Sequence, residues 1–125
     1  MSDFLYIVDQ PALTDFCARL RGVTWIALDT EFIREQTFYP QLCLIQIATP
    51  DQIACVDPLA LPSLDPLLDL LYDPAITKVL HAAHQDLELF FHLRSATPAP
   101  IFDTQLAALV LGCGSQIGYA ALVQQ

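Results

Sequence analysis

The stretch WIALDTEFIREQTFYPQLCLIQIATP, residues 25 to 50, is the most strand-like part of this chain, yet its segment DTEF contains two acids, Asp29 and Glu31. Side chains alternate between the two faces of a strand, so residues two positions apart share a face and lie about 7 Å apart. Both faces of the run from Thr24 to Phe32 are otherwise apolar, which predicts a central strand covered on both sides, with the acids near an interior end. Two carboxylates in such a place repel each other unless a cation or a proton lies between them. The alternative is that the strand ends at Asp29 and that both acids are solvated loop residues.

The composition is that of one folded domain. The chain has 125 residues, of which 54% are hydrophobic and 15% charged, and this excludes a disordered chain. Charged and polar residues interrupt every apolar run before it could cross a membrane. The first ten residues, MSDFLYIVDQ, lack the basic and apolar regions of a secretory signal, so we expect a cytoplasmic protein.

The cysteines and the net charge limit the chemistry. Cys17, Cys43, Cys55 and Cys113 are widely spaced and form no CxxC or Cys/His pattern, which favours buried reduced thiols over a metal or redox site. Fourteen acids against five bases give a formal charge of −9, which is unfavourable for binding nucleic acid through its phosphates alone. A nucleic-acid ligand would therefore require bound divalent cations or a basic segment that this chain lacks.

Apolar periodicity and turn residues predict an α/β domain. The predicted strands are 4–8, 25–32, 41–48, 52–56, 78–82 and a very short strand that ends at Phe102. The predicted helices are 10–20, 64–72, 85–93, 104–111 and one that begins at Gly118. Strands come first as a group and later alternate with helices, so we expect a mixed sheet: an antiparallel meander followed by parallel strands, with helices on its flanks.

A third acid, Asp86, lies in the sequence HAAHQDLELFFHL, residues 81 to 93. The apolar stripe of this predicted helix extends back to Asp86 at spacings of three and four residues, which places an acid on the core-facing side of the first turn. An ordinary first-turn acid stabilised by the helix dipole is the alternative. The preceding strand would bring Asp86 to the same edge of the sheet as Asp29 and Glu31. Three carboxylates there would require a counter-charge, and oxygen ligands favour Mg²⁺ or Mn²⁺.

Four blocks of this sequence, in this order, resemble ribonuclease D and its relatives, which are 3′ to 5′ exonucleases with a DEDD active site on a ribonuclease H-like fold. The blocks are DTEF at 29–32, PQLCLIQIA at 40–48, HAAHQDLELF at 81–90 and IFDTQLAALVLG at 101–112. DTEF alone is a weak signal, but the ordered set is specific.

The resemblance implies roles for five residues. Asp29 and Glu31 match the first motif of the family and Asp86 the second, so these catalytic carboxylates would bind two divalent ions, Mg²⁺ or Mn²⁺. Glu31 would also meet the terminal 3′ hydroxyl. Thr30 and Phe32, as neighbours in the first motif, would contact the last nucleotide. Two-metal hydrolysis of a phosphodiester fits this set, because metal ions activate water and stabilise the charge on phosphate.

The third motif of the family, a Tyr followed four residues later by an Asp, is not matched. Tyr119 is followed at that distance by Val123. Residues 1–125 are therefore predicted to be a partial exonuclease domain, truncated at its C-terminus, without the third motif and the C-terminal helical domains. It is either a shortened gene product or a piece of a longer one, and we expect weak or no activity.

The predicted function is the hydrolysis of RNA 3′ ends in structured RNA such as tRNA precursors. A nuclease-derived binding or interaction module without catalysis is the alternative. A phosphotransfer enzyme with an aspartyl nucleophile is disfavoured, because DTEFIR lacks the second Asp and the Gly-rich turn that it would need. The expected partners are RNA 3′ ends and not membranes, with self-association through the surface that the truncation leaves uncovered.

Five further residues receive structural interpretations. Asp103 is a natural N-cap for the helix that follows it, which we favour over a ligand role. His81, His84 and His92 show no i, i+4 pairing, so a zinc site is disfavoured. Arg34, close to the first motif, could meet a phosphate, but a solvated surface arginine is favoured.

Overall fold

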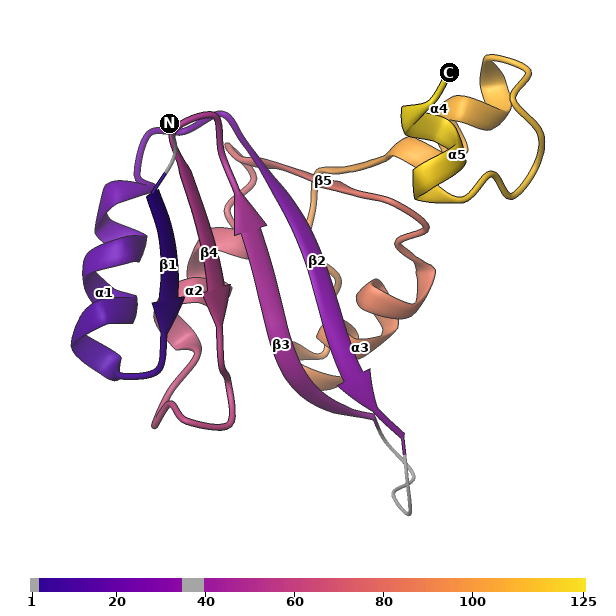
Figure 1. Ribbon diagram of the computed structural model, residues 1–125. Helices are drawn as coiled ribbons and strands as arrows, with labels where there is room; N and C mark the ends of the chain where they lie inside the picture. The colour runs from indigo at the N-terminus through magenta and orange to yellow at the C-terminus, as the bar shows by residue number, and fades with distance from the viewer. Residues whose placement is uncertain (1–2, 35–39) are drawn as a thin grey trace.

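The computed structural model describes residues 3–34 and 40–125. In this part of the chain the strands form one six-stranded sheet in the order β1-β4-β3-β2-β5-β6 (Figure 1). The strands are β1 (Asp3–Ile7), β2 (Trp25–Ile33), β3 (Gln41–Ala48), β4 (Gln52–Val56), β5 (Thr77–Leu80) and β6 (Ile101–Asp103). All six lie within two residues of the predicted strands.

The predicted topology is confirmed. β2, β3 and β4 form an antiparallel meander, and β5 and β6 then add in parallel to β2. The parallel pairing of β1 with β4 at the far edge was not predicted. β5 ends at Leu80, two residues earlier than expected, because Ala82 turns the chain with a left-handed φ of 57°.

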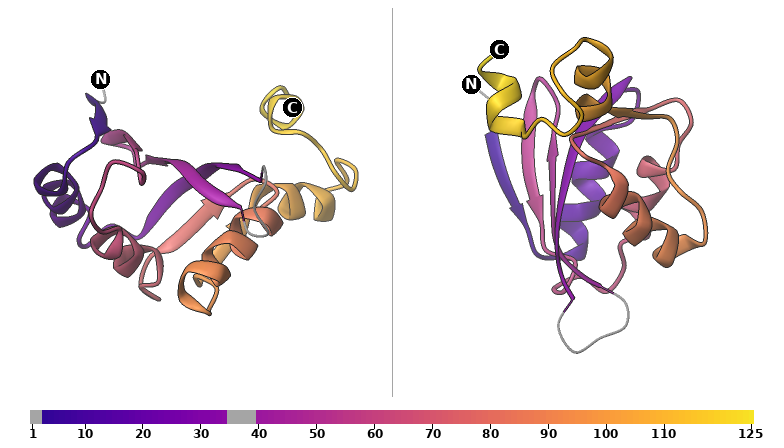
Figure 2. Two further views of the ribbon diagram at one scale, coloured as in Figure 1. Left: turned by 90° about the horizontal axis from the view of Figure 1, so that it is seen from below. Right: turned by 90° about the vertical axis from the view of Figure 1, so that its right-hand side faces the viewer.

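Three of the helices cover one face of the sheet. In Figures 1 and 2, α1, α2 and α3 lie on the same side of the strands, whereas α5 stands on the opposite side near one end of the sheet. The helices are α1 (Gln10–Arg19), α2 (Asp65–Leu71), α3 (His84–Arg94), α4 (Thr104–Val110) and α5 (Tyr119–Val123). Gly112 and Gly114, with φ of 88° and 96°, follow the end of α4, where a positive φ favours glycine.

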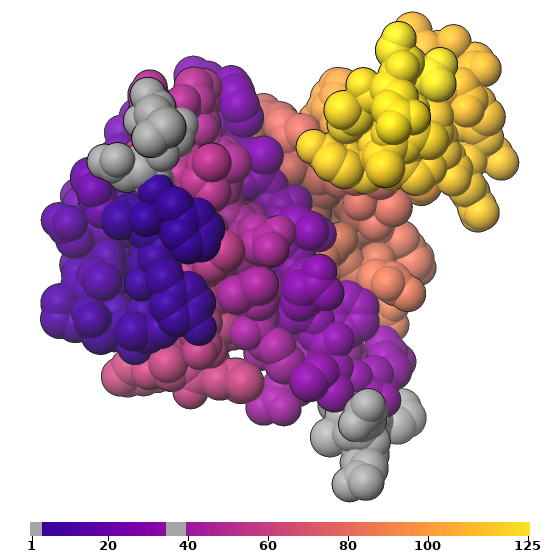
Figure 3. Space-filling model, in the orientation of Figure 1, coloured from indigo at the N-terminus to yellow at the C-terminus, as the bar shows by residue number. Residues whose placement is uncertain are grey.

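β2 shows which face of the sheet forms the core. Its side chains Ile26, Leu28 and Thr30 are at most 6% exposed, whereas Asp29 and Glu31 are exposed. The expectation that β2 is covered on both sides is therefore wrong for the part of the chain that the structure describes, because α1, α2 and α3 all pack on one side. Figure 3 shows the other face, which no helix covers over β3 and β4. The alternative that the strand ends at Asp29 is also wrong.

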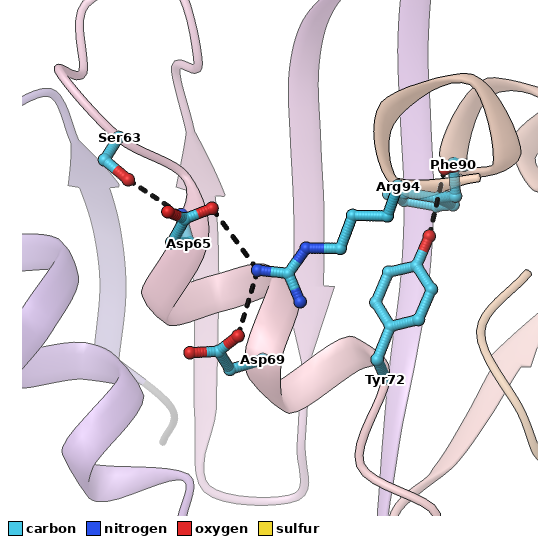
Figure 4. Close-up of polar contacts among 6 residues, drawn as sticks. All are labelled: Ser63, Asp65, Asp69, Tyr72, Phe90 and Arg94. Carbon is cyan, nitrogen blue, oxygen red and sulfur yellow. Dashed lines mark hydrogen bonds and ion pairs between the residues drawn. The ribbon is translucent and has the colours of Figure 1, made fainter. Parts of the chain in front are cut away.

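Polar contacts join α2 to α3 (Figure 4). The guanidinium of Arg94 lies 3.3 Å from the carboxylate of Asp65 and 2.9 Å from that of Asp69, and it also lies over the ring of Tyr72. The Tyr72 hydroxyl donates to the carbonyl oxygen of Phe90 at 3.0 Å. These contacts fix the position of α3, the helix that contains Asp86.

Lys78 of β5 is fully buried, with 0% of its surface exposed. Its ammonium donates to the carbonyl oxygens of Asp73, Ile76 and Ala99, so three backbone acceptors take the place of water. Burial lowers the pKa of Lys78, and the charge of Asp73 partly opposes this effect. The ammonium thereby ties the loop before β5 to the loop before β6.

Candidate metal and active site

Asp29 and Glu31 lie on the face of β2 opposite α1, α2 and α3, which we call the open face. They lie where β2 extends beyond its neighbour β5. β5 pairs with β2 only from Trp25 to Ala27, so in the described residues the later part of β2 has no strand on that side. β3 still pairs with β2 on the other side, and the register places Gln46 opposite Asp29. Both carboxylates are exposed, and Asp29 accepts the backbone N–H of Thr30 at 3.0 Å.

Asp86 approaches the same part of β2 from the side that the helices cover. It lies in the first turn of α3, and only 7% of its surface is exposed. The hydroxyl of Thr30, itself 6% exposed, donates to Oδ1 of Asp86. Because Thr30 points away from the face of Asp29 and Glu31, Asp86 meets β2 from the opposite side of the strand.

The electrostatics connect the three acids. Burial raises the pKa of Asp86, the negative charges of Asp29 and Glu31 raise it further, and the hydrogen bond from Thr30 opposes the rise. Each carboxylate of the pair therefore lies within electrostatic reach of Asp86. In residues 3–34 and 40–125, however, no three His, Cys, Asp or Glu side chains come close enough to hold one metal ion. That Asp29, Glu31 and Asp86 share ions stays a prediction.

The donor chemistry of this site fits a hard divalent cation. Carboxylate oxygens are the ligands that Mg²⁺ and Mn²⁺ prefer, and Asp29 and Glu31 present theirs on an exposed surface. A cation would also relieve the repulsion that raises the pKa of Asp86. That Asp29, Glu31 and Asp86 together bind a metal stays a prediction.

Asp103 is the N-cap of α4, as predicted, and it also binds the turn before α3. Its carboxylate accepts the N–H of Gln105 at 2.8 Å, and those of Ala82 and Ala83 at 3.0 and 2.8 Å. Burial alone would raise the pKa of Asp103, but these backbone donors outweigh it and lower the pKa below its usual value. Asp103 thus holds the turn that brings Asp86 to β2.

A hollow of about 700 Å³ lies on the open face beside Asp29. Ala27 and Ala48, which pair with each other in β2 and β3, form part of its lining, and their small side chains leave space above the sheet. Tyr119 of α5 and His81 also line it. Gln46, His81 and Tyr119 were not predicted as site residues. Pairing the two predicted strands in register would have found Gln46, but no local pattern indicates the other two.

The remaining candidates lie as follows. Phe32 is half-buried and packs against the core, and the side chain of Thr30 is buried, so their contact with a nucleotide stays a prediction. Arg34 lies 3.9 Å from the carboxylate of Glu88, and both side chains are more than half exposed, which favours the surface interpretation. None of the described helices is both long enough and apolar enough to span a bilayer.

Comparison with known proteins shows the family. A family model described as 3′-5′ exonuclease matches residues 4–125. Ribonuclease D of Sphingobium indicum is 51% identical over 120 residues, and the match covers 94% of this chain and 31% of that protein. Ribonuclease D of Zymomonas mobilis is 51% identical over 122 residues, which cover 95% of this chain and 31% of that protein.

A solved structure agrees with these relatives. The crystal structure of Escherichia coli RNase D, an exoribonuclease involved in structured RNA processing, superposes with a TM-score of 0.91 at 41% identity. The match covers 98% of this chain and 32% of that one, so the chain spans about a third of the length of the proteins it matches. With the mixed sheet, the flanking helices and the family model in agreement, this chain belongs to the 3′-5′ exonuclease family and has the fold of ribonuclease D.

Proposed function

We propose that this chain forms part of the catalytic domain of a 3′-5′ exoribonuclease that hydrolyses the terminal phosphodiesters of RNA, including tRNA precursors. The observation that supports this most is the position of the three acids. Asp29 and Glu31 lie on β2, and Asp86 lies beside the same strand at the start of α3, where their negative charges help to raise its pKa. Three carboxylates that repel one another in this way suit a cationic ligand.

The metal supplies the chemistry in this proposal. Two Mg²⁺ or Mn²⁺ ions, when bound, lower the pKa of water and stabilise charge on the phosphate. Asp29, Glu31 and Asp86 would hold them. Glu31 would also accept the terminal 3′ hydroxyl, and Thr30 and Phe32 would contact the last nucleotide. The Thr30 hydroxyl donates to Asp86, so its role toward RNA would fall to its backbone.

Activity of the 125 residues alone should be weak or absent. The printed sequence has no Tyr-x-x-x-Asp segment after Asp86, since Tyr119 is followed by Val123 at that spacing. Positioning of water by a general acid–base group typically contributes about 10²–10⁴ in rate, and a missing carboxylate would weaken metal binding further. A cytoplasmic location belongs to the proposal and is supported by four free cysteines.

The test compares the 125-residue chain with a version extended through the third motif of its relatives. Each is assayed with Mn²⁺ on a single-stranded RNA, and on the same RNA with its 3′ end blocked. We expect cleavage by the extended form only, loss of cleavage on blocking, and loss in Glu31→Ala and Asp86→Ala. Glu88→Ala is the matched control, because Glu88 is an exposed acid of α3 two residues beyond Asp86.

Two results would contradict the proposal. Full activity of the 125-residue chain would show that the catalytic set is misplaced. An extended form that binds RNA without cleaving it would instead favour a nuclease-derived binding module.

A further inference from the structure

The carbonyl oxygen of Ile117 accepts two side-chain donors from two different elements. Nε2 of His81, just after β5, lies 2.8 Å from it, and Nε2 of Gln105, in the first turn of α4, lies 3.1 Å from it. Two N–H donors on one loop carbonyl fix the chain at that point. We call His81, Thr104, Gln105 and the Ile117 carbonyl the Ile117 clamp.

Thr104 orients the imidazole ring. Its hydroxyl lies 2.9 Å from Nδ1 of His81 and 3.2 Å from the carbonyl oxygen of Leu80. Because the Ile117 carbonyl can only accept, Nε2 of His81 must carry a hydrogen. The Thr104 hydroxyl donates its one hydrogen to the Leu80 carbonyl oxygen, and its oxygen lies beside Nδ1 of His81. The contact between His81 and Ile117 thus requires a hydrogen on Nε2 of His81.

The Ile117 clamp fixes the position of α5. This helix has five residues, Tyr119 to Val123, which is too short for a helix to be stable by itself. Ile117 lies two residues before Tyr119, and the Tyr119 ring meets the His81 ring edge to face at 5.8 Å. Release of the Ile117 carbonyl would therefore free Tyr119 as well.

Tyr119 and Asp29 line the same hollow. The hollow also exposes Gln46, the cross-strand neighbour of Asp29, and the small Ala27 and Ala48. Its volume of about 700 Å³ is in the range of small-ligand sites. These residues suit a nucleoside monophosphate. Its base could stack on the Tyr119 ring, because bases stack on aromatic rings, and Gln46 and Asp29 offer polar groups beside it.

We propose that His81 is a positioning residue for nucleotide binding: through the Ile117 clamp it holds Tyr119 against the hollow, so that a nucleoside monophosphate bound at Asp29 contacts the Tyr119 ring. The inference rests on the proposed function, because it takes Asp29 as a metal ligand. It differs from a purely structural role, in which the clamp would stabilise the fold without influence on a ligand.

The functional test is calorimetric titration of the 125-residue chain with Mn²⁺, and then with adenosine 5′-monophosphate in the presence of Mn²⁺. We expect His81→Ala and Tyr119→Leu to weaken nucleotide binding about fivefold or more, with unchanged Mn²⁺ affinity. His81→Gln, which keeps a donor for the Ile117 carbonyl, should restore part of the affinity. Phe91→Leu is the matched control, because Phe91 is 55% exposed on α3, away from the hollow.

The outcomes separate the two proposals. Nucleotide affinity that is unchanged in His81→Ala, even with a lower melting temperature, would overturn the inference and leave the metal site standing. The same holds for a wild-type chain that binds Mn²⁺ but not the nucleotide. A chain that binds neither, or in which Asp29→Asn leaves Mn²⁺ affinity unchanged, would overturn the proposed site together with the inference.

A spectroscopic measurement checks the clamp without a ligand. Long-range proton–nitrogen correlation spectra report which ring nitrogen of a neutral histidine carries the hydrogen. We expect Nε2–H for His81, and Thr104→Val should change the Nδ1 signal. A neutral Nδ1–H ring would show that the clamp does not form.

Discussion

Replacement of Thr30 by Val tests the contact between the two motifs of the candidate site. The substitution removes the hydroxyl that donates to Asp86 and keeps the size and branching of the side chain, which suit the middle of a strand. Both residues are buried, at 6% and 7% exposure, so water cannot easily replace the lost donor. We therefore expect a clear loss of stability at neutral pH.

The magnitude follows from the charge of the acceptor. A hydrogen bond to an ionised group contributes about 1.5–3 kcal/mol, so Thr30→Val should cost about 2 kcal/mol. For a domain of this size, that corresponds to a fall in melting temperature of roughly 6–10 °C.

The sign of the pH dependence follows from the raised pKa of Asp86. Burial and the charges of Asp29 and Glu31 raise it in the folded state, so the folded chain binds the Asp86 proton more tightly than the unfolded chain does. The contribution of Asp86 to stability therefore falls as the pH rises from its unfolded pKa through its folded pKa. Without the Thr30 donor the folded pKa rises further, and the loss caused by Thr30→Val should shrink in acid, where Asp86 is protonated.

Urea denaturation at neutral pH and at about pH 4 measures both effects, the lower value being near the pKa of an ordinary aspartate. Asp86→Asn and the double variant complete a mutant cycle, and Thr77→Val of β5 is a control for the exchange of residue type in a strand. Two results would refute the reasoning. One is a loss of stability in Thr30→Val below about 0.5 kcal/mol at neutral pH, which is within the range of an ordinary surface substitution. The other is that Thr30→Val costs as much stability in the Asp86→Asn variant as in the unchanged chain.

The remaining predictions concern the acids and the apolar surface. Asp103→Ala should destabilise the chain by about 1–2 kcal/mol above the ordinary aspartate pKa. The pKa of Asp103 is lowered in the folded state, so its contribution is lost as the pH falls through that lowered value, and melting curves at several pH values would show a difference that fades in acid. Asp29→Asn should weaken an already weak Mn²⁺ affinity in calorimetric titration, and an unchanged affinity would remove Asp29 from the site. Self-association is expected through the apolar residues around α4 and α5, since Val110, Leu111 and Val123 are 84%, 81% and 65% exposed. Light scattering would contradict this prediction if it found a monomer at high concentration while α5 stayed ordered.

Local sequence patterns predicted much of the fold. The period-2 pattern placed β2 correctly and put Asp29 and Glu31 on one face. The cap at Asp103 and the glycines after α4 also have local causes, namely a carboxylate that accepts N–H groups and a backbone with positive φ. Such features depend only on residues close in the sequence.

The parts that were missed depend on contacts between distant segments. Periodicity shows which side chains of β2 share a face, but not which face the helices cover, and this is why two-sided cover was expected. The contact between Thr30 and Asp86 joins positions 56 residues apart, and that between His81 and Ile117 joins positions 36 apart. The left-handed turn at Ala82 separates β5 from α3 and sets how Asp86 approaches β2, but alanine gives no sequence signal for such a turn.

Lys78 is the only lysine in the printed sequence, and its amine is enclosed by backbone carbonyls in the core. Reagents that acylate amines should therefore leave Lys78 unmodified as long as the chain stays folded. Any label that appears on Lys78 would record the opening of the sheet.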